Sequence, residues 1–448
     1  MIRIPAPSGA PAHAEKEDPV HDLQATAPPD PAREVEQPGT RRATSVASRG
    51  ADRGTILVLW TGYPAGPVVH RSLSRAGFRA LGAHPRGRGG RSPSCPRPDR
   101  YPAPRDEPDA FLGWLAGVVA AMGVDAVLPL DEDIVRLLAE RGPEVPGLTV
   151  VGPTREQYRS LCDKLTLTRT AASLGIDSPH TVEVGDDGPT GSWPALPSIV
   201  KPATSVSGGA AAGLVRSAAE RDELVGRMLA QGITPLVQEQ VVGPRWVVHS
   251  VRGPGVFEHL THRVGLEWPR GAGLASVKIV ETTPAPVLRA ALALLDEADY
   301  RGPSGISLLE RDGRYHVHDV NLRLGATARA SVHAGFDFPR RAVEAALELG
   351  GRPFEGRARR GRYMRLDLEV MALREAISTR RSGGDPAGVL RGIAAVAADR
   401  RGRLDPSPLD PFGIWPPVAS ALLRGALGRR SAGPTARDSA PPTIGDRP

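Results

Sequence analysis

Short apolar runs alternate with helix-like stretches between Thr55 and Leu130, and this alternation constrains the fold more than any other feature of the sequence. Short apolar runs that end at turn residues indicate buried strands, and helices between them favour an open, mostly parallel sheet. The turn Gly62–Gly66 lacks the glycine spacing of a dinucleotide fingerprint. The predicted strands are Thr55–Thr61, Phe78–Ala83 and Ala126–Leu130, the predicted helices Pro67–Ala76 and Asp109–Met122, and the predicted loop Gly87–Pro104.

From residue 151 onward the pattern changes to paired strands separated by single helices. Asp312-Gly313 is a strong hairpin signal between two apolar runs. Thr154 is a typical N-cap residue, and Gly175 is a typical residue just past a helix end. The predicted helices are Thr154–Leu174, Ala218–Leu229, Pro286–Glu297 and Phe338–Leu349, and the predicted strands are Pro197–Pro202, Leu214–Val215, Leu236–Val241, Trp246–Val251, Gly255–His262, Gly305–Glu310 and Tyr315–Val320.

The charge of the chain is unevenly distributed. The net charge is +7, yet seventeen arginines and nine acidic residues lie from Arg357 to the C-terminus, so the rest is close to neutral. This distribution argues against nucleic acid as a partner. It leaves a weak possibility of peripheral membrane contact through the Arg357–Pro448 appendage, where Val418–Leu427 could form an amphipathic helix, although packing against the core is the favoured interpretation.

Neither cysteine nor histidine spacing indicates a structural metal or disulfide framework. Cys95 and Cys162 stand alone, which fits a reducing cytoplasm. His316 and His318 share a strand face but have no convincingly spaced third ligand, so we expect core or surface imidazoles. No apolar run approaches the roughly 20 residues that span a bilayer, and the N-terminal stretch lacks the apolar segment of a signal peptide.

Lysine is rare, and two of the four lysines lie in possible phosphate-binding segments. Lys16, Lys164, Lys201 and Lys278 stand against fifty-three arginines. In a chain that uses arginine for most of its positive charges, a lysine is expected where a compact cation is needed. Lys201 ends an apolar strand and precedes a small-residue loop with Ser205, Gly208, Gly209 and Gly213, whose backbone N–H groups could contact phosphate oxygens. A flexible hairpin with a surface lysine is the alternative.

Two further strands carry polar side chains at positions suited to a nucleotide. The strand that starts at Leu236 could offer Glu239 and its backbone to an adenine, or it could be a solvated edge strand. Asp319, Asn321 and Arg323 are two residues apart, so they share one strand face. The two oxygen-bearing side chains suit Mg²⁺ and the guanidinium suits a phosphoryl or carboxylate group.

Taken in order, these motifs resemble the ATP-grasp superfamily, most closely the carbamoyl-phosphate-synthase-like and biotin-carboxylase-like carboxylate–amine ligases. The resemblance covers roughly Thr55–Gly351. The motifs are Asp163-Lys164, Leu174–Pro179, Ile199–Pro202, Gln238-Glu239 and Asp319–Arg323.

The resemblance implies an α/β fold that is α+β in its ATP-grasp part. The implied units are a Rossmann-like pre-ATP-grasp domain (54–152), a linker helix and small lobe (153–234) and a large catalytic lobe (235–355). Outside them, the proline-rich ends predict disordered tails (1–53 and 431–448), and the basic segment 356–430 is predicted to be a helical appendage. The implied activity is ATP-dependent ligation in the cytoplasm, in which a small-molecule carboxylate becomes an acyl phosphate that an amine attacks. A homodimer is possible.

The resemblance also implies roles for individual residues. Lys164 and Lys201 would bind the α- and β-phosphates of ATP, with Ser205, Gly208 and Gly209 in the loop that closes over them. Glu239, Gln240 and Val241 would frame the adenine. Asp319 and Asn321 would coordinate Mg²⁺, and Arg323, with Arg263 as a further phosphate ligand, would stabilise the transferring phosphoryl group.

Three positions depart from the family pattern. The family has a first metal-binding carboxylate twelve residues before the acidic residue at Asp319, and this chain has Ser307 there, with Glu310 expected on the other strand face. Asp319 stands where glutamate is customary, and Arg245 stands where many members have an acid. These departures keep open a catalytically weak nucleotide-binding protein. A bicarbonate-using enzyme is a further alternative.

Overall fold

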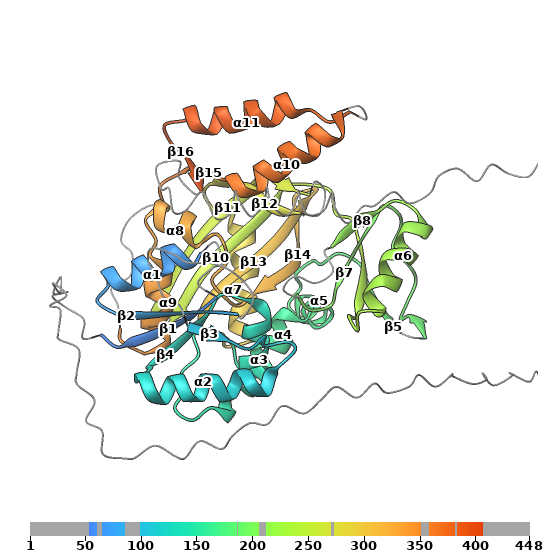
Figure 1. Cartoon of the computed structure of the whole chain (residues 1–448). Coiled ribbons are helices and arrows are strands. Elements are labelled where there is room, and N and C mark those ends of the chain that lie inside the picture. The colour runs from blue at the N-terminus through green and yellow to red at the C-terminus, as the bar shows by residue number, and fades with distance from the viewer. Residues whose placement is uncertain are drawn as a thin grey trace, which may run out of the picture. The chain divides into compact units, whose positions relative to one another are not determined.

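The computed structural model describes residues 53–60, 65–85, 99–185, 187–205, 212–269, 273–350, 358–380 and 383–405. The two predicted tails, Gly208, Gly209 and the predicted helix Val418–Leu427 lie outside these described residues. The chain divides into two units, Met1–Arg49 and Gly50–Pro448. All described residues belong to the second unit (Figure 1).

A parallel four-stranded sheet in the order β3-β2-β1-β4 comes first, and it confirms the predicted open sheet. The prediction of a loop was wrong at Asp99–Tyr101, which pairs with the edge of β2. The helix α3 was not predicted; it begins after Asp131, whose carboxylate accepts hydrogen bonds from two backbone N–H groups. The elements are β1 (Thr55–Leu59), α1 (Gly66–Arg75), β2 (Arg79–Pro85), β3 (Asp99–Tyr101), α2 (Pro108–Met122), β4 (Ala126–Pro129), α3 (Glu132–Arg141) and the 3-10 turn η1 (Gly142–Glu144).

An antiparallel five-stranded sheet in the order β6-β5-β9-β7-β8 follows, together with α6. The single helix predicted over Thr154–Leu174 is in fact two helices. Asp163 has extended backbone angles and its side chain caps the second helix, so it ends the first. The elements are α4 (Arg155–Cys162), α5 (Lys164–Ser173), β5 (Thr181–Gly185), β6 (Gly188–Pro189), β7 (Ser198–Pro202), β8 (Gly213–Val215), α6 (Ala218–Leu229) and β9 (Pro235–Glu239).

A seven-stranded sheet in the order β14-β13-β10-β11-β12-β15-β16 forms the largest layer, and its strands are antiparallel except for the pair β15–β16. The predicted hairpin is confirmed, with positive φ at Asp312 and Gly313. The region after Arg357 is not purely helical, because β15 and β16 extend this sheet beside α10 and α11 (Figure 1). The elements are β10 (Arg245–Gly253), β11 (Val256–Trp268), β12 (Leu274–Val280), α7 (Ala285–Glu297), β13 (Gly302–Arg311), β14 (Arg314–Asn321), α8 (Ala328–Ala334), α9 (Phe338–Ala346), β15 (Gly361–Arg365), α10 (Leu366–Ser378), α11 (Pro386–Ala398) and β16 (Gly402–Asp405).

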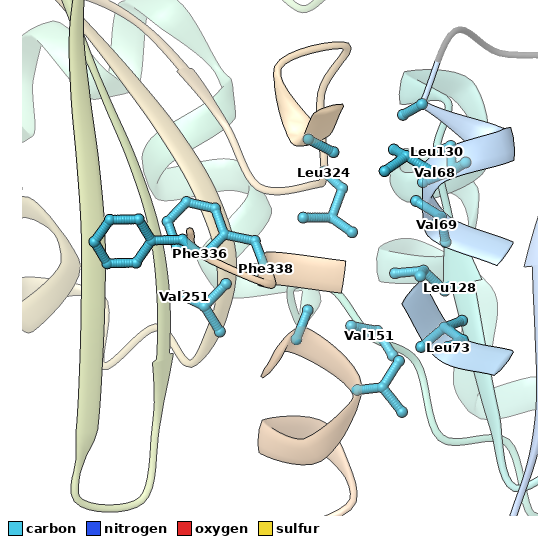
Figure 2. Packing of buried hydrophobic residues seen from close by; sticks show 14 of the residues in the cluster. Val68, Val69, Leu73, Leu128, Leu130, Val151, Val251, Leu324, Phe336 and Phe338 are labelled. Atoms are coloured by element: carbon cyan, nitrogen blue, oxygen red, sulfur yellow. The ribbon is translucent and has the colours of Figure 1, made fainter. Parts of the chain in front are cut away.

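One hydrophobic cluster joins the first sheet to the largest one. Figure 2 shows Leu73 of α1 and Leu128 of β4 on one side and Val251 of β10 with Phe336 and Phe338 on the other. These side chains are all at most 8% exposed. A second cluster fills the space between α4, α5, α7 and one face of the seven-stranded sheet. The opposite face packs partly against the first cluster, through Val251, Leu260 and Val280, and also carries polar groups.

Candidate active site

Strand register decides which side chains of β14 share a face with the neighbouring strand. Asp319 pairs with Ser307 of β13, and Asn321 pairs with Gly305. The intervening pair, Ile306 and Val320, is buried in the apolar cluster on the opposite face. Asp319 and Asn321 therefore project from the polar face of the sheet.

Two lysines from different parts of the chain meet at Asp319. The Nζ atom of Lys164, at the start of α5, lies 3.6 Å from Asp319 Oδ1 and also donates to Ser205 Oγ over 3.2 Å. The Nζ atom of Lys201, at the end of β7, donates to the backbone oxygen of His318 over 2.9 Å. Both lysines are only 6% exposed. The five-stranded and seven-stranded sheets thus bring two buried cations and one carboxylate together.

These cations perturb one another's ionisation. Burial, followed by the nearby Lys164 cation, lowers the pKa of Lys201 from 10.5 to about 7, against the opposing effect of Asp319. Burial would raise the pKa of Asp319, but Lys164, His318, Lys201 and the hydrogen bond from Asn321 outweigh it and lower that pKa below its usual value. The carboxylate therefore stays ionised beside a lysine that titrates near neutral pH.

Arg323 completes the cluster and is held by a buried acid that the sequence did not single out. Its Nη2 atom lies 3.5 Å from Asn321 Oδ1, and its Nε atom donates to Glu132 Oε2 over 2.8 Å. Glu132 is 3% exposed and accepts a second hydrogen bond from the Tyr158 hydroxyl over 3.2 Å. Glu132 directly follows Asp131, the N-cap residue of α3. A second acidic residue next to a helix cap was the sequence feature that could have identified Glu132.

Glu239 lies where β9 ends beside the β13–β14 hairpin. Its Oε1 atom accepts from Arg311 Nη1 over 2.6 Å, and Oε2 accepts from the backbone N–H of His180 over 3.3 Å. The Arg311 hydrogen bond is the main cause that lowers the pKa of Glu239. Gln240 and Val241 follow directly on the chain, and Val241 is buried.

Other predicted positions lie away from this cluster. Arg263 pairs with Trp246 in the register of β10 and β11, so it projects from the opposite face to Asp319, and it forms a two-point ion pair with Glu281 at 3.0 and 3.3 Å. Glu310 accepts a hydrogen bond from Trp246 Nε1 over 2.8 Å. The structure does not bring Arg263 or Glu310 to the polar face.

The sequence analysis missed a second group of basic residues on the polar face. Lys278 of β12 pairs with Val264, and its Nζ atom donates to the Ala275 backbone oxygen over 3.1 Å. Burial lowers the pKa of Lys278 to about 7, with a further contribution from Arg365 and opposition from Asp405. The scarcity of lysine was the one signal that could have identified it. His249 and His262 stack near it with ring centroids 5.1 Å apart.

The described residues contain neither a cluster of protein metal ligands nor a helix that could span a membrane. Within the ranges given above, no three histidine, cysteine or acidic side chains gather as a metal cluster. A metal at Asp319 would therefore need oxygen ligands from a bound nucleotide as well. Among the helices of the same ranges, none is long and apolar enough to cross a membrane.

Comparisons with known proteins identify the fold. No family model and no curated protein sequence matches this chain. An L-amino acid ligase from Bacillus licheniformis superposes with a TM-score of 0.55 at 15% identity, covering 66% of this chain and 74% of the ligase. A biotin carboxylase from Campylobacter jejuni, in complex with β-γ-ATP, gives 0.55 at 14% identity, covering 69% and 74%. An N5-carboxyaminoimidazole ribonucleotide synthetase in an ADP complex gives 0.53 at 16% identity, covering 69% and 80%.

Proposed function

We propose that this chain, whose fold is the ATP-grasp fold of these neighbours, is an ATP-dependent carboxylate–amine ligase. In the proposed reaction a carboxylate oxygen attacks the γ-phosphorus of ATP, and ADP leaves. The amine then attacks the acyl carbon, the C–O bond to phosphate breaks, and inorganic phosphate is released. Phosphoryl transfer of this kind needs positioning and charge neutralisation more than covalent participation by the protein.

The convergence of Lys164 and Lys201 beside Asp319 is the observation that carries the proposal. Lys164, together with Lys201 in its protonated form, exceeds the charge of the one neighbouring carboxylate, and the phosphates of ATP would neutralise that excess and favour protonation of Lys201. Arg323 would stabilise the transferring phosphoryl group, and its ion pair with Glu132 would hold the guanidinium in position. Arg263, paired with Glu281 on the other face, has no role in this proposal.

The nucleotide would lie between the five-stranded and seven-stranded sheets. Ser205, which accepts from Lys164, would add a hydroxyl to the phosphate-binding group. Glu239, Gln240 and Val241 would frame the adenine at the end of β9, with Arg311 fixing the Glu239 carboxylate. The backbone beyond Glu239 is suited to this role because it leaves the sheet there.

The oxygen atoms of Asp319 and Asn321 fit a magnesium ion that takes most of its ligands from phosphate. The Asp319 side chain is 25% exposed and ionised, and the Asn321 amide lies within 2.7 Å of it. Magnesium is commonly held by one or two carboxylates together with substrate phosphates. Bound there, Mg²⁺ would neutralise charge on the phosphate oxygens.

The test is ADP formation by the purified chain with Mg²⁺ and ATP over a panel of carboxylic acids and amines. We expect turnover that requires an acid, and a decrease of roughly 100-fold in Asp319→Asn. Asp222→Asn, an exposed position on α6, is the matched control and should leave the rate unchanged. Equal rates in Asp319→Asn and the wild type would contradict the proposal.

A second candidate is a nucleotide-binding protein with weak turnover. It is favoured by Ser307, which stands directly across from Asp319 and offers a hydroxyl where the resemblance implies a second carboxylate. Titrating ATP with and without Mg²⁺ separates the two candidates. Nucleotide binding that is independent of the metal, without acid-stimulated ADP formation, would favour the second.

A further inference from the structure

A cavity of about 1150 Å³ lies beside the first half of β11 and the segment that follows β12, next to the segments that flank β15 and β16. Arginines supply most of its charge. Arg359 and Arg360 precede β15, and Arg400, Arg401 and Arg403 surround the start of β16. The one acidic residue in its lining is Glu281, which is already paired with Arg263.

These five arginines differ from most arginines elsewhere in the described chain. None of them forms an ion pair with a carboxylate among the described residues. Arg360 donates to the Thr282 hydroxyl, and Arg403 donates to the backbone oxygens of Arg400 and Gly402 over 3.3 and 2.8 Å. All five are exposed, so solvent screens their mutual repulsion, and an anion that binds among them would be attracted by several guanidinium groups at once.

A close backbone approach holds the two arginine segments side by side. A Cβ atom at Gly361 would lie 2.4 Å from the backbone oxygen of Arg401, so only glycine allows β15 to lie this close to the turn before β16. The parallel pairing of Arg362 with Gly402 continues the contact. The arginines are therefore positioned by the sheet and not by a loose surface segment.

The floor of the cavity is partly apolar. Leu260, Phe336 and Tyr363 contribute to its lining, and His333 stacks on Tyr363 with centroids 6.2 Å apart. Burial lowers the pKa of His333, so that imidazole adds no charge at neutral pH. A concave, half-open site with partly apolar walls and several arginines suits a small organic polyanion better than a nucleic acid, which binds along extended basic surfaces.

The cavity also adjoins the polar face of the seven-stranded sheet. Tyr363 pairs directly with Lys278 across β12 and β15. A small gap between them and α8 is lined by Lys278, His333 and Tyr363, and the last two also line the large cavity. Lys278 and Asp319 lie four strands apart on one face, roughly 19 Å from strand to strand, and the gap at Lys278 holds only about 10 Å³, so the cavity and the lysine cluster are separate sites.

We propose that this cavity binds a small organic acid with at least two anionic groups. The arginines would contact these groups from both sides of the close approach between β15 and the turn before β16. The site would be separate from the lysine cluster at Asp319.

Calorimetric titration of the full chain without nucleotide tests the cavity independently of turnover. The probes are citrate and inorganic pyrophosphate, with butyrate as the monovalent comparison and a short single-stranded RNA as the alternative ligand. We expect citrate and pyrophosphate to bind and butyrate and RNA to bind at least tenfold more weakly. The double variant Arg359→Ser/Arg401→Ser should weaken citrate binding roughly 100-fold, about tenfold for each charged hydrogen-bonding group.

The matched control is Arg227→Ser/Arg391→Ser, which removes two exposed arginines from α6 and α11 and should leave citrate binding unchanged. The cavity proposal is overturned by absence of citrate and pyrophosphate binding, by equal weakening in both double variants, or by RNA binding more tightly than citrate. Citrate binding without acid-stimulated ADP formation would retain the cavity and reject the ligase. ADP formation with monocarboxylates alone, without citrate binding, would retain the ligase and reject the cavity.

Discussion

Nucleotide binding should be coupled to protonation of Lys201. In the ligand-free protein the pKa of this side chain is lowered to about 7, mainly by burial and then by Lys164. A bound polyphosphate would favour the ammonium form and raise that pKa again. Binding should therefore take up a proton above pH 7, and affinity should fall as pH rises through 7.

The size of the effect follows from the shift. With a pKa of about 7 in the free protein and one near 10.5 in the complex, binding at pH 7.5 should take up about 0.8 proton. Between pH 6.5 and pH 8.5 the dissociation constant should increase roughly 25-fold, which corresponds to about 2 kcal/mol.

Titration calorimetry in buffers of different ionisation enthalpy measures the proton uptake directly. The comparison variant is Lys201→Arg, whose guanidinium stays charged over this range, so its uptake and pH dependence report only the phosphates and other groups. Lys201→Met should bind weakly, also without this pH dependence. The same proton uptake in wild type and both variants would refute the assignment of Lys201 to the phosphates.

Three further predictions concern the hairpin, the buried ion pair and the glycine contact. Ser307→Glu adds a carboxylate across the hairpin from the proposed metal ligand and should raise Mg²⁺ affinity at least tenfold, measured by Mg²⁺ titration of ADP formation; Ser307→Gln is the uncharged control. Glu132→Gln leaves Arg323 without its buried carboxylate and should lower the free energy of unfolding by about 3 kcal/mol, read from urea denaturation, with unchanged stability contradicting the pairing. Gly361→Ala should cost about 1–3 kcal/mol because its Cβ meets a backbone oxygen, whereas Gly113→Ala in α2, where nothing lies within 4 Å, should not destabilise.

Local sequence patterns predicted the fold well wherever the residues that define a helix, strand or turn lie close together in the chain. The parallel sheet, the β13–β14 hairpin at Asp312-Gly313 and α6 follow from apolar periodicity and turn residues. The ATP-grasp fold was reached through motif order, and the structural neighbours support it. Apolar periodicity and turn residues are local features, so a sequence displays them directly.

The features that sequence reasoning missed depend on contacts between distant segments. The strand β15 is defined by pairing with β12, far away in the chain, and β16 is defined by pairing with β15; the residues of both strands are rich in arginine. The face occupied by Arg263 depends on the register between β10 and β11. Glu132 becomes significant only because α3 places it beside Arg323. Pairing and contacts between segments far apart in the chain leave no local pattern in the sequence.

The charge balance of the polar face connects these results. Buried lysines at positions 164, 201 and 278 are accompanied by few carboxylates, so the ligand-free protein bears an electrostatic cost. The unfolded chain keeps its lysines protonated to about pH 10.5, whereas Lys201 and Lys278 lose their protons near pH 7 in the folded protein. Since the unfolded state then binds more protons, stability should rise with pH between about 7 and 10.5. An anionic ligand removes the same cost at neutral pH, so it should stabilise the fold most at low pH and least above pH 9.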